Sequence, residues 1–182
     1  MDPPQLNRSA PSEYRVHFNT SAGTFTVEVM RAWAPNAADR FYNLVEHGYF
    51  DGQRFFRVIP KRLVQFGLHG MPEVAARWYD ATLPDDPVQL DNKRGTVAFA
   101  SAGTPHSRTT QIYVNLSENK DFDRMGFVPF GRIIRGIETV DQIHGGYGEV
   151  PEQNRIAREG NDYLTRNFPA LDSISEARIS ND

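Results

Sequence analysis

The sequence predicts a mainly β domain of the barrel or sandwich class, in which two helices accompany a set of short strands. Apolar residues alternate over short stretches along much of the chain, and Gly, Pro, Asp and Asn separate these stretches. Two segments, 35–47 and 136–144, instead carry apolar residues at helical spacing. The 182 residues suffice for one domain, and we predict a disordered lead-in over 1–13 followed by that domain over 14–182.

The first structured element is a predicted hairpin of two strands with about equal arms. Gly23 supplies the turn, because glycine adopts a positive φ at no steric cost. The alternating apolar residues of the two arms are Tyr14, Val16, Phe18, Phe25, Val27 and Val29.

A helix is predicted next, over 35–47. Pro35 fits its first turn, where a missing N–H costs nothing, and Gly48 ends it. The remaining strand candidates are 54–59, 63–66, 96–100, 111–116, 130–134 and 171–179, with the second helix at 136–144. The segment from about 145 is a C-terminal extension rich in Gly, Asn and Arg, to which the sequence assigns no chemistry.

Composition excludes several classes of function. Net charge is −3, so we expect no general attraction to nucleic acid. Cysteine is absent, which excludes thiol catalysis, and we find no apolar run near the length of a membrane span. Compartment stays open: the chain is cytoplasmic if Met1 is native, and periplasmic or exported if a signal peptide was removed.

Familiar catalytic and metal-binding patterns are missing too. The histidines His17, His47, His69, His106 and His144 are scattered without ligand spacing, so no metal site is predicted. There is no G-x-S-x-G turn, and GGYG at 145–148 lacks the lysine of a P-loop. No cofactor is expected.

A few polar residues stand among the apolar strands and suggest a binding groove. Arg57 lies inside an apolar run, and buried arginine is costly unless it has a partner or a task. Gln65, Ser101 and Gln111 occupy similar settings. Aromatic residues stand close by in sequence, at Phe56, Phe99, Tyr113, Phe122 and Phe127. This pattern indicates a groove that binds an apolar group and offers hydrogen bonds to it.

Five motifs then resemble those of one family, in order and at compatible spacing. They are FDGQRFFRVIP at 50–60, VQFG at 64–67, NKRGTVAFASAG at 92–103, TTQIYVNL at 109–116 and FVPFGRIIRGIETVDQI at 127–143. Together they are similar to the cyclophilins of bacterial type, which are peptidyl-prolyl cis/trans isomerases. The resemblance runs from about Tyr14 to His144.

The resemblance implies a closed eight-stranded antiparallel barrel capped by the two predicted helices. It implies that Arg57 is catalytic and that Gln65 is its hydrogen-bonding partner. The substrate-binding residues that it implies are Arg62, Leu63, Ala100, Ser101, Ala102, Gln111, Tyr113, Phe122 and Phe127. The implied substrates are X-Pro peptides and unfolded proteins, and we expect a monomer that acts without nucleic acid, membrane or cofactor.

Two departures from the family pattern stand out. Arg62 takes the place of the phenylalanine that forms the floor of the proline pocket, so we expect weakened prolyl binding. Asp121 stands at or next to the place of the tryptophan that binds cyclosporin, so we expect weak cyclosporin binding. The rival interpretations are a peptide-binding or chaperone-like module of the same fold with little catalysis and, less well supported, a barrel that carries small apolar ligands.

Overall fold

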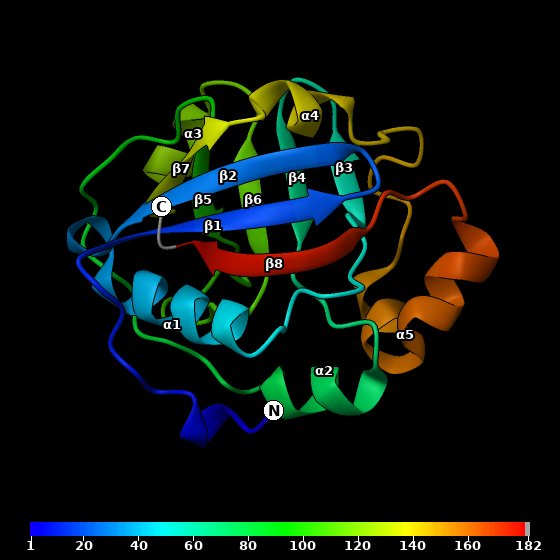
Figure 1. Ribbon diagram of the computed structural model, residues 1–182, viewed down its shortest axis with the longest axis horizontal. Coiled ribbons are helices and arrows are strands. Elements are labelled where there is room, and N and C mark those ends of the chain that lie inside the picture. Colours follow the sequence, from blue (N-terminus) through cyan, green and yellow to red (C-terminus); the bar gives the residue numbers. More distant parts are fainter. Residues whose placement is uncertain (181–182) are drawn as a thin grey trace.

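The computed structural model describes residues 1–180, and within them the strands form one eight-stranded antiparallel sheet (Figure 1). Its order is β3-β4-β6-β5-β7-β2-β1-β8. The strands are β1 Glu13–Thr20, β2 Gly23–Met30, β3 Arg57–Ile59, β4 Leu63–Phe66, β5 Thr96–Phe99, β6 Ile112–Asn115, β7 Pro129–Arg135 and β8 Ile174–Ser180. The prediction of a mainly β fold with eight antiparallel strands is confirmed.

The prediction that the barrel is closed is wrong, because β3 and β8 form the two ends of a curled, open sheet. Strand β3 is only three residues long, and the chain before it meets the chain before β8 instead. Backbone bonds of 2.8 Å run from Gly52 N to Ile174 O and from Ile174 N to Gln53 O, and Arg54 bridges to Ser173. These bonds pair backbone groups that would otherwise lie open at the gap.

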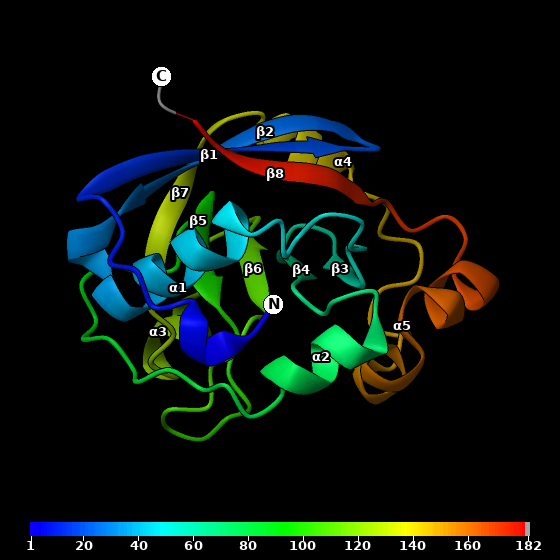
Figure 2. The ribbon, with the colours of Figure 1, turned by 60° about the horizontal axis from the view of Figure 1, so that its bottom comes forward.

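Helices α1 (Pro35–Glu46) and α4 (Ile137–Gln142) occur where the sequence predicts them. They lie apart, at the lower left and the top of Figure 1, and both contribute side chains to the core inside the curled sheet. Two further α-helices were not predicted, α2 (Pro72–Trp78) and α3 (Lys120–Arg124). A fifth, α5 (Gln153–Asn167), lies in the C-terminal extension. Short 3₁₀ helices span Pro3–Gln5 and Arg31–Trp33. Helices α2 and α5 lie side by side at the edge of the molecule (Figure 2).

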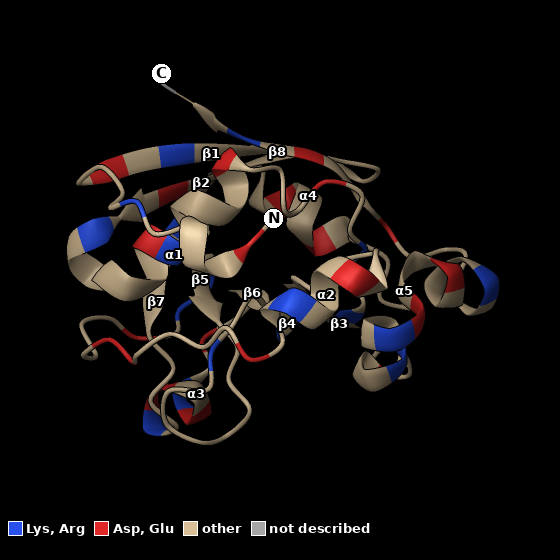
Figure 3. Cartoon of the chain, turned by 90° about the horizontal axis from the view of Figure 1, so that it is seen from below, with Lys and Arg blue, Asp and Glu red and all other residues tan. Residues whose placement is uncertain are grey.

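Helix α5 is amphipathic, although it is rich in polar residues. Ile156, Tyr163 and Leu164 are buried on one face. Arg155 and Arg166 pair with Glu159 at 2.8 and 3.4 Å, and both signs of charge are present on this helix (Figure 3). Within residues 1–180 no helix is long and apolar enough to cross a bilayer.

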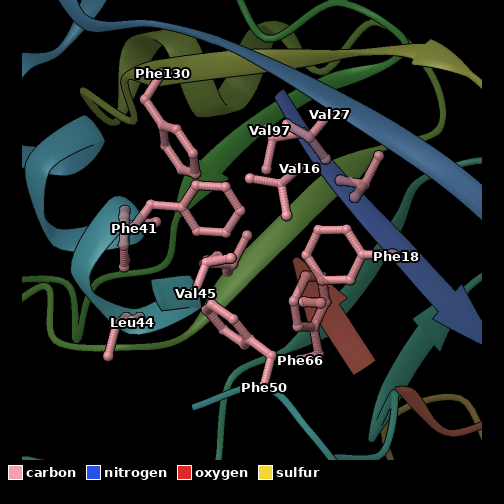
Figure 4. Packing of buried hydrophobic residues seen from close by; sticks show 14 of the residues in the cluster. Val16, Phe18, Val27, Phe41, Leu44, Val45, Phe50, Phe66, Val97 and Phe130 are labelled. Carbon is pink, nitrogen blue, oxygen red and sulfur yellow. The ribbon is translucent and has the colours of Figure 1, made fainter. Parts of the chain in front are cut away.

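The main core lies inside the curl of the sheet, where aromatic rings from strands and α1 meet (Figure 4). Phe18 and Phe25 stack at a centroid distance of 4.7 Å across the β1–β2 hairpin. Phe41 projects from α1 to within 5.0 Å of the Phe130 ring on β7. The core is therefore filled by the protein's own side chains, as in other small barrels.

The N-terminal segment, for which the sequence predicts a disordered lead-in, makes hydrogen bonds to α1. The buried amide of Asn43 on α1 accepts a bond from Arg8 N (3.1 Å) and donates one to Arg8 O (2.7 Å). Asp39 Oδ1 accepts from Ala10 N at 2.8 Å. Two polar side chains of α1 thus hold a segment that has few apolar residues of its own.

Candidate active site

The outer face of β3, β4, β5 and β6 forms a groove, because side chains alternate between the two faces of a strand. On β4, Val64 and Phe66 point into the main core, while Leu63 belongs to a separate apolar cluster on the outside. On β6, Val114 joins the main core and Tyr113 joins the outer cluster. The register places Arg57 opposite Gln65, and Gln65 opposite Tyr113.

A cavity of about 570 Å³ opens on this face. Ten of the eleven predicted site residues line it: Arg57, Leu63, Gln65, Ala100, Ser101, Ala102, Gln111, Tyr113, Phe122 and Phe127. They come from β3, β4, β6, α3 and the loops beside them, and are separated by up to 70 positions in sequence. The fold therefore brings the predicted polar and apolar site residues to one place.

The polar side of the cavity is a chain of directed hydrogen bonds. Arg57 Nη1 donates to Gln65 Oε1 at 3.0 Å, and Gln65 Nε2 donates to Gln111 Oε1 at 2.8 Å. Gln65 is buried, and both the oxygen and the nitrogen of its side-chain amide are hydrogen-bonded. These two bonds fix the orientation of the amide. The Arg57 side chain is 29% exposed, which leaves the guanidinium accessible from the cavity.

The apolar side is an aromatic pocket. The rings of Tyr113, Phe122 and Phe127 meet edge to face, with centroid distances between 5.2 and 5.8 Å. Leu63 and Ala98 complete the buried part of this cluster. Edge-to-face packing fixes ring orientation. The cluster therefore forms a preformed apolar wall of the cavity.

The hydroxyl of Tyr113 is held outside the pocket by a buried asparagine. It donates to Asn92 Oδ1 at 2.7 Å, and burial raises the pKa of Tyr113 well above its ordinary value. Asn92 Nδ2 donates to Asp123 Oδ1 and to the Phe127 carbonyl, each at 2.9 Å. One buried amide thus ties together two walls of the pocket, and the ring of Tyr113 presents an apolar face to the cavity.

Arg62 is the predicted site residue that lies outside the described lining of the cavity. Its Nη2 donates to Asp121 Oδ2 at 2.6 Å, and its guanidinium lies 4.9 Å from the centre of the Phe122 ring. This hydrogen bond lowers the pKa of Asp121. The two departures from the family pattern are therefore partners in one ion pair, stacked on the outside of the pocket wall. Phe122 supplies apolar surface that Arg62 does not.

For the activity that the resemblance implies, replacing Arg62 with phenylalanine should still raise kcat/KM for a short X-Pro peptide. We expect a gain of at most about tenfold, because ~50 Å² of added apolar contact is worth about 1.3 kcal/mol. Steady-state isomerisation assays of the two proteins would measure it. Asp121→Asn is the control, since it breaks the ion pair without adding apolar surface. An unchanged kcat/KM in Arg62→Phe would contradict the idea that Arg62 weakens prolyl binding.

Sequence reasoning missed a second wall of the cavity. This wall is lined by residues from the end of α2, Trp78 and Tyr79, and from the start of α5, Gln153 and Asn154. Trp78 is buried, whereas Tyr79 is exposed at the rim. Sequence reasoning also missed Glu149, whose Oε1 accepts a hydrogen bond from Arg57 Nε at 2.6 Å. No motif marked these residues, because their segments differ from those of the family. Among residues 1–180 we find no cluster of three or more His, Asp or Glu side chains able to hold a metal ion.

Comparisons with known proteins agree with this geometry. The profile of the family described as "Cyclophilin type peptidyl-prolyl cis-trans isomerase/CLD" matches residues 15–161. A peptidyl-prolyl cis-trans isomerase of Streptomyces antibioticus is 33% identical over 153 residues, covering 76% of this chain and 92% of the relative. One of Acinetobacter baylyi is 30% identical over 162 residues, covering 81% and 85%.

Solved structures show the same fold. The crystal structure of a cyclophilin-type peptidyl-prolyl cis-trans isomerase of Cryptosporidium parvum has a TM-score of 0.70 at 20% identity, and covers 93% of this chain and 99% of its own. A second structure of that protein, obtained in the presence of the dipeptide Ala-Pro, has a TM-score of 0.68 at 20% identity and covers 92% and 99%.

Proposed function

The chain belongs to the cyclophilin-type peptidyl-prolyl cis-trans isomerases, and we propose that Arg57 is the cation through which it accelerates rotation about X-Pro bonds. One observation carries this assignment. Arg57 is held by Gln65 at the edge of a preformed apolar pocket, within one cavity. A prolyl ring in the pocket would set its own amide bond beside the guanidinium.

The chemistry needs an electrostatic donor and no covalent step. Resonance gives the X-Pro amide its double-bond character, and rotation crosses a barrier of about 18–20 kcal/mol. In the twisted transition state the prolyl nitrogen loses its resonance and gains a lone pair. A guanidinium N–H aimed at that nitrogen stabilises the twisted form more than either planar form, which is the requirement for catalysis.

The other site residues have binding roles in this proposal. Tyr113, Phe122, Phe127 and Leu63 bury the prolyl ring by the hydrophobic effect. The extended segment Ala100, Ser101 and Ala102 offers backbone groups to the peptide, and Gln111 extends the row of polar groups from Gln65. Arg62 contributes indirectly, because its guanidinium packs against the ring of Phe122, which lines the cavity.

The substrates proposed for this chain are X-Pro segments of peptides and unfolded proteins. The Ala-Pro dipeptide used with the Cryptosporidium parvum relative supports a proline-containing ligand. We further propose that cyclosporin binds weakly, because Asp121 and its ion pair replace an aromatic rim, and that the protein acts as a monomer. A non-catalytic peptide-binding module is not favoured, since the named relatives are isomerases.

The test follows both partners by NMR. A catalytic amount of protein should produce cis–trans exchange cross-peaks in an Ala-Pro-containing peptide, whose uncatalysed exchange takes tens of seconds or longer. With labelled protein, amide shifts should concentrate at Ser101, Gln111, Tyr113 and Phe127. The same peptide with Pro replaced by Ala is the control. Absence of exchange, or shifts confined to another face, would contradict the proposal.

A further inference from the structure

The segment between α4 and α5 is built onto the strand that carries Arg57. Val58 N donates to Gly148 O at 3.2 Å, and Gly148 N turns back to Gly145 O at 3.1 Å. The backbone approaches so closely that a Cβ at Gly145 would lie 2.9 Å from Pro60 Cγ. Gly148 has φ of +53°, a conformation that glycine adopts without strain. The next residue, Glu149, is therefore fixed beside β3.

Glu149 binds the guanidinium on the side away from Gln65. Its Oε1 accepts from Arg57 Nε at 2.6 Å and also contacts Nη2, while Gln65 takes a hydrogen from Nη1 at 3.0 Å. A guanidinium has five N–H bonds, and these two hydrogen bonds use one on Nε and one on Nη1. Three N–H bonds are not used by these two hydrogen bonds, and contacts on two sides of the guanidinium set the orientation of its plane.

We propose that Glu149 is a positioning residue for catalysis, which holds Arg57 in the orientation that reaches the prolyl nitrogen. This inference rests on the proposed role of Arg57. An arginine has several rotatable bonds, and a free one loses much of its rotamer entropy when it engages the transition state. Holding the side chain beforehand removes that cost from the reaction.

The carboxylate also reduces the positive potential near the reacting nitrogen, which would act in the opposite direction. Two observations make orientation the larger effect. The Glu149 side chain is 61% exposed, so solvent screens its charge strongly. Its hydrogen bond to Arg57 Nε is short, at 2.6 Å, and acts directly on the group that must be aligned. Removing Glu149 should therefore lower activity.

The experiment compares Glu149→Ala with Glu149→Gln. We expect Glu149→Ala to lower kcat about tenfold, corresponding to about 1.4 kcal/mol, with little change in KM. Glu149→Gln keeps an oxygen acceptor without the charge, so it should recover most of the parent kcat. Glu152→Ala is the matched control: it removes the same charge three residues away, where the partner Arg155 lies 3.9 Å distant. Thermal melts should be alike for all four proteins.

A second readout does not depend on catalysis. The Arg57 Nε–H signal in the NMR spectrum, identified by its loss in Arg57→Lys, should be protected from exchange in the parent and in Glu149→Gln. It should broaden or disappear in Glu149→Ala. Equal protection in all variants, or a kcat that is unchanged or raised in Glu149→Ala, would overturn the inference. An inactive parent that retains a Glu149-dependent signal would instead refute the role of Arg57 and leave the contact intact.

Discussion

Arg57→Ala should lower kcat/KM for an X-Pro reporter peptide by about 10²–10³-fold, the usual loss when one donor aimed at a developing charge is removed. The pocket of Tyr113, Phe122 and Phe127 remains, so KM should change much less than kcat. Such a loss corresponds to about 2.7–4 kcal/mol of transition-state stabilisation. The measurement is the initial rate of cis-to-trans isomerisation over a range of peptide concentrations.

Two further variants separate charge from geometry at this site. Arg57→Lys keeps a positive charge but loses the planar fork that bonds Gln65 and Glu149 together, so we expect it to remain well below the parent. Arg77→Ala removes an exposed arginine from α2, outside the cavity lining, and should leave kcat/KM unchanged. If Arg57→Ala kept more than about a tenth of the parent activity, electrostatic stabilisation by Arg57 would be a minor effect, worth under about 1.4 kcal/mol.

Much of the fold was predictable because periodicity is a local property. Strict alternation along 14–29 placed the β1–β2 hairpin, and Pro35 and Gly48 marked the ends of α1. The full length of helix α5 was not predicted, because its polar composition hides a buried face that repeats over only a few turns. Whether the sheet closes depends on backbone pairing between residues 52–55 and 172–174, which no local pattern encodes.

In the candidate site, too, local sequence patterns predicted some features, and contacts between distant residues were missed. Ten residues were predicted by matching motifs, and the alternation of strands brings them to one cavity. The pairing of Arg62 with Asp121 joins two residues 59 positions apart, and each alone looked like damage to the pocket. Glu149 comes from a segment with no motif. Contacts between distant charged side chains depend on tertiary structure, so single-sequence reasoning has no signal for them.

The long segment after β4 contains a buried acid that organises α1. Helix α1 begins at Ala34-Pro35 without a side-chain acceptor of its own. Asp86, fifty residues later in sequence, accepts from Asn36 N at 2.8 Å and from Ala37 N at 3.1 Å. Its side chain is 1% exposed and also binds Arg108, itself 5% exposed, at 3.1 Å. One carboxylate thus caps a helix and neutralises a buried cation.

Asp86→Ala should reduce the free energy of unfolding by about 3–5 kcal/mol, the usual cost of removing one member of a buried ion pair. The loss has two sources, since Arg108 keeps only Asp85 and the Pro84 carbonyl as partners, and α1 loses two bonds at its N-terminus. Urea unfolding followed by circular dichroism would measure it. Asp85→Ala is the control: Asp85 is 39% exposed, and its loss should cost about 1 kcal/mol or less.

A double-mutant cycle distinguishes the two sources of that loss. In an Arg108→Met background no buried cation is left unpaired, so Asp86→Ala should then cost only what the helix cap contributes, about 0.5–2 kcal/mol. The difference in the Asp86→Ala effect between the two backgrounds measures the free-energy cost of leaving Arg108 without its buried partner. An Asp86→Ala effect no larger than that of Asp85→Ala would contradict the assignment. It would mean that water reaches Arg108 and the first turn of α1 once the carboxylate is removed. Water would then replace the hydrogen bonds that Asp86 makes to both.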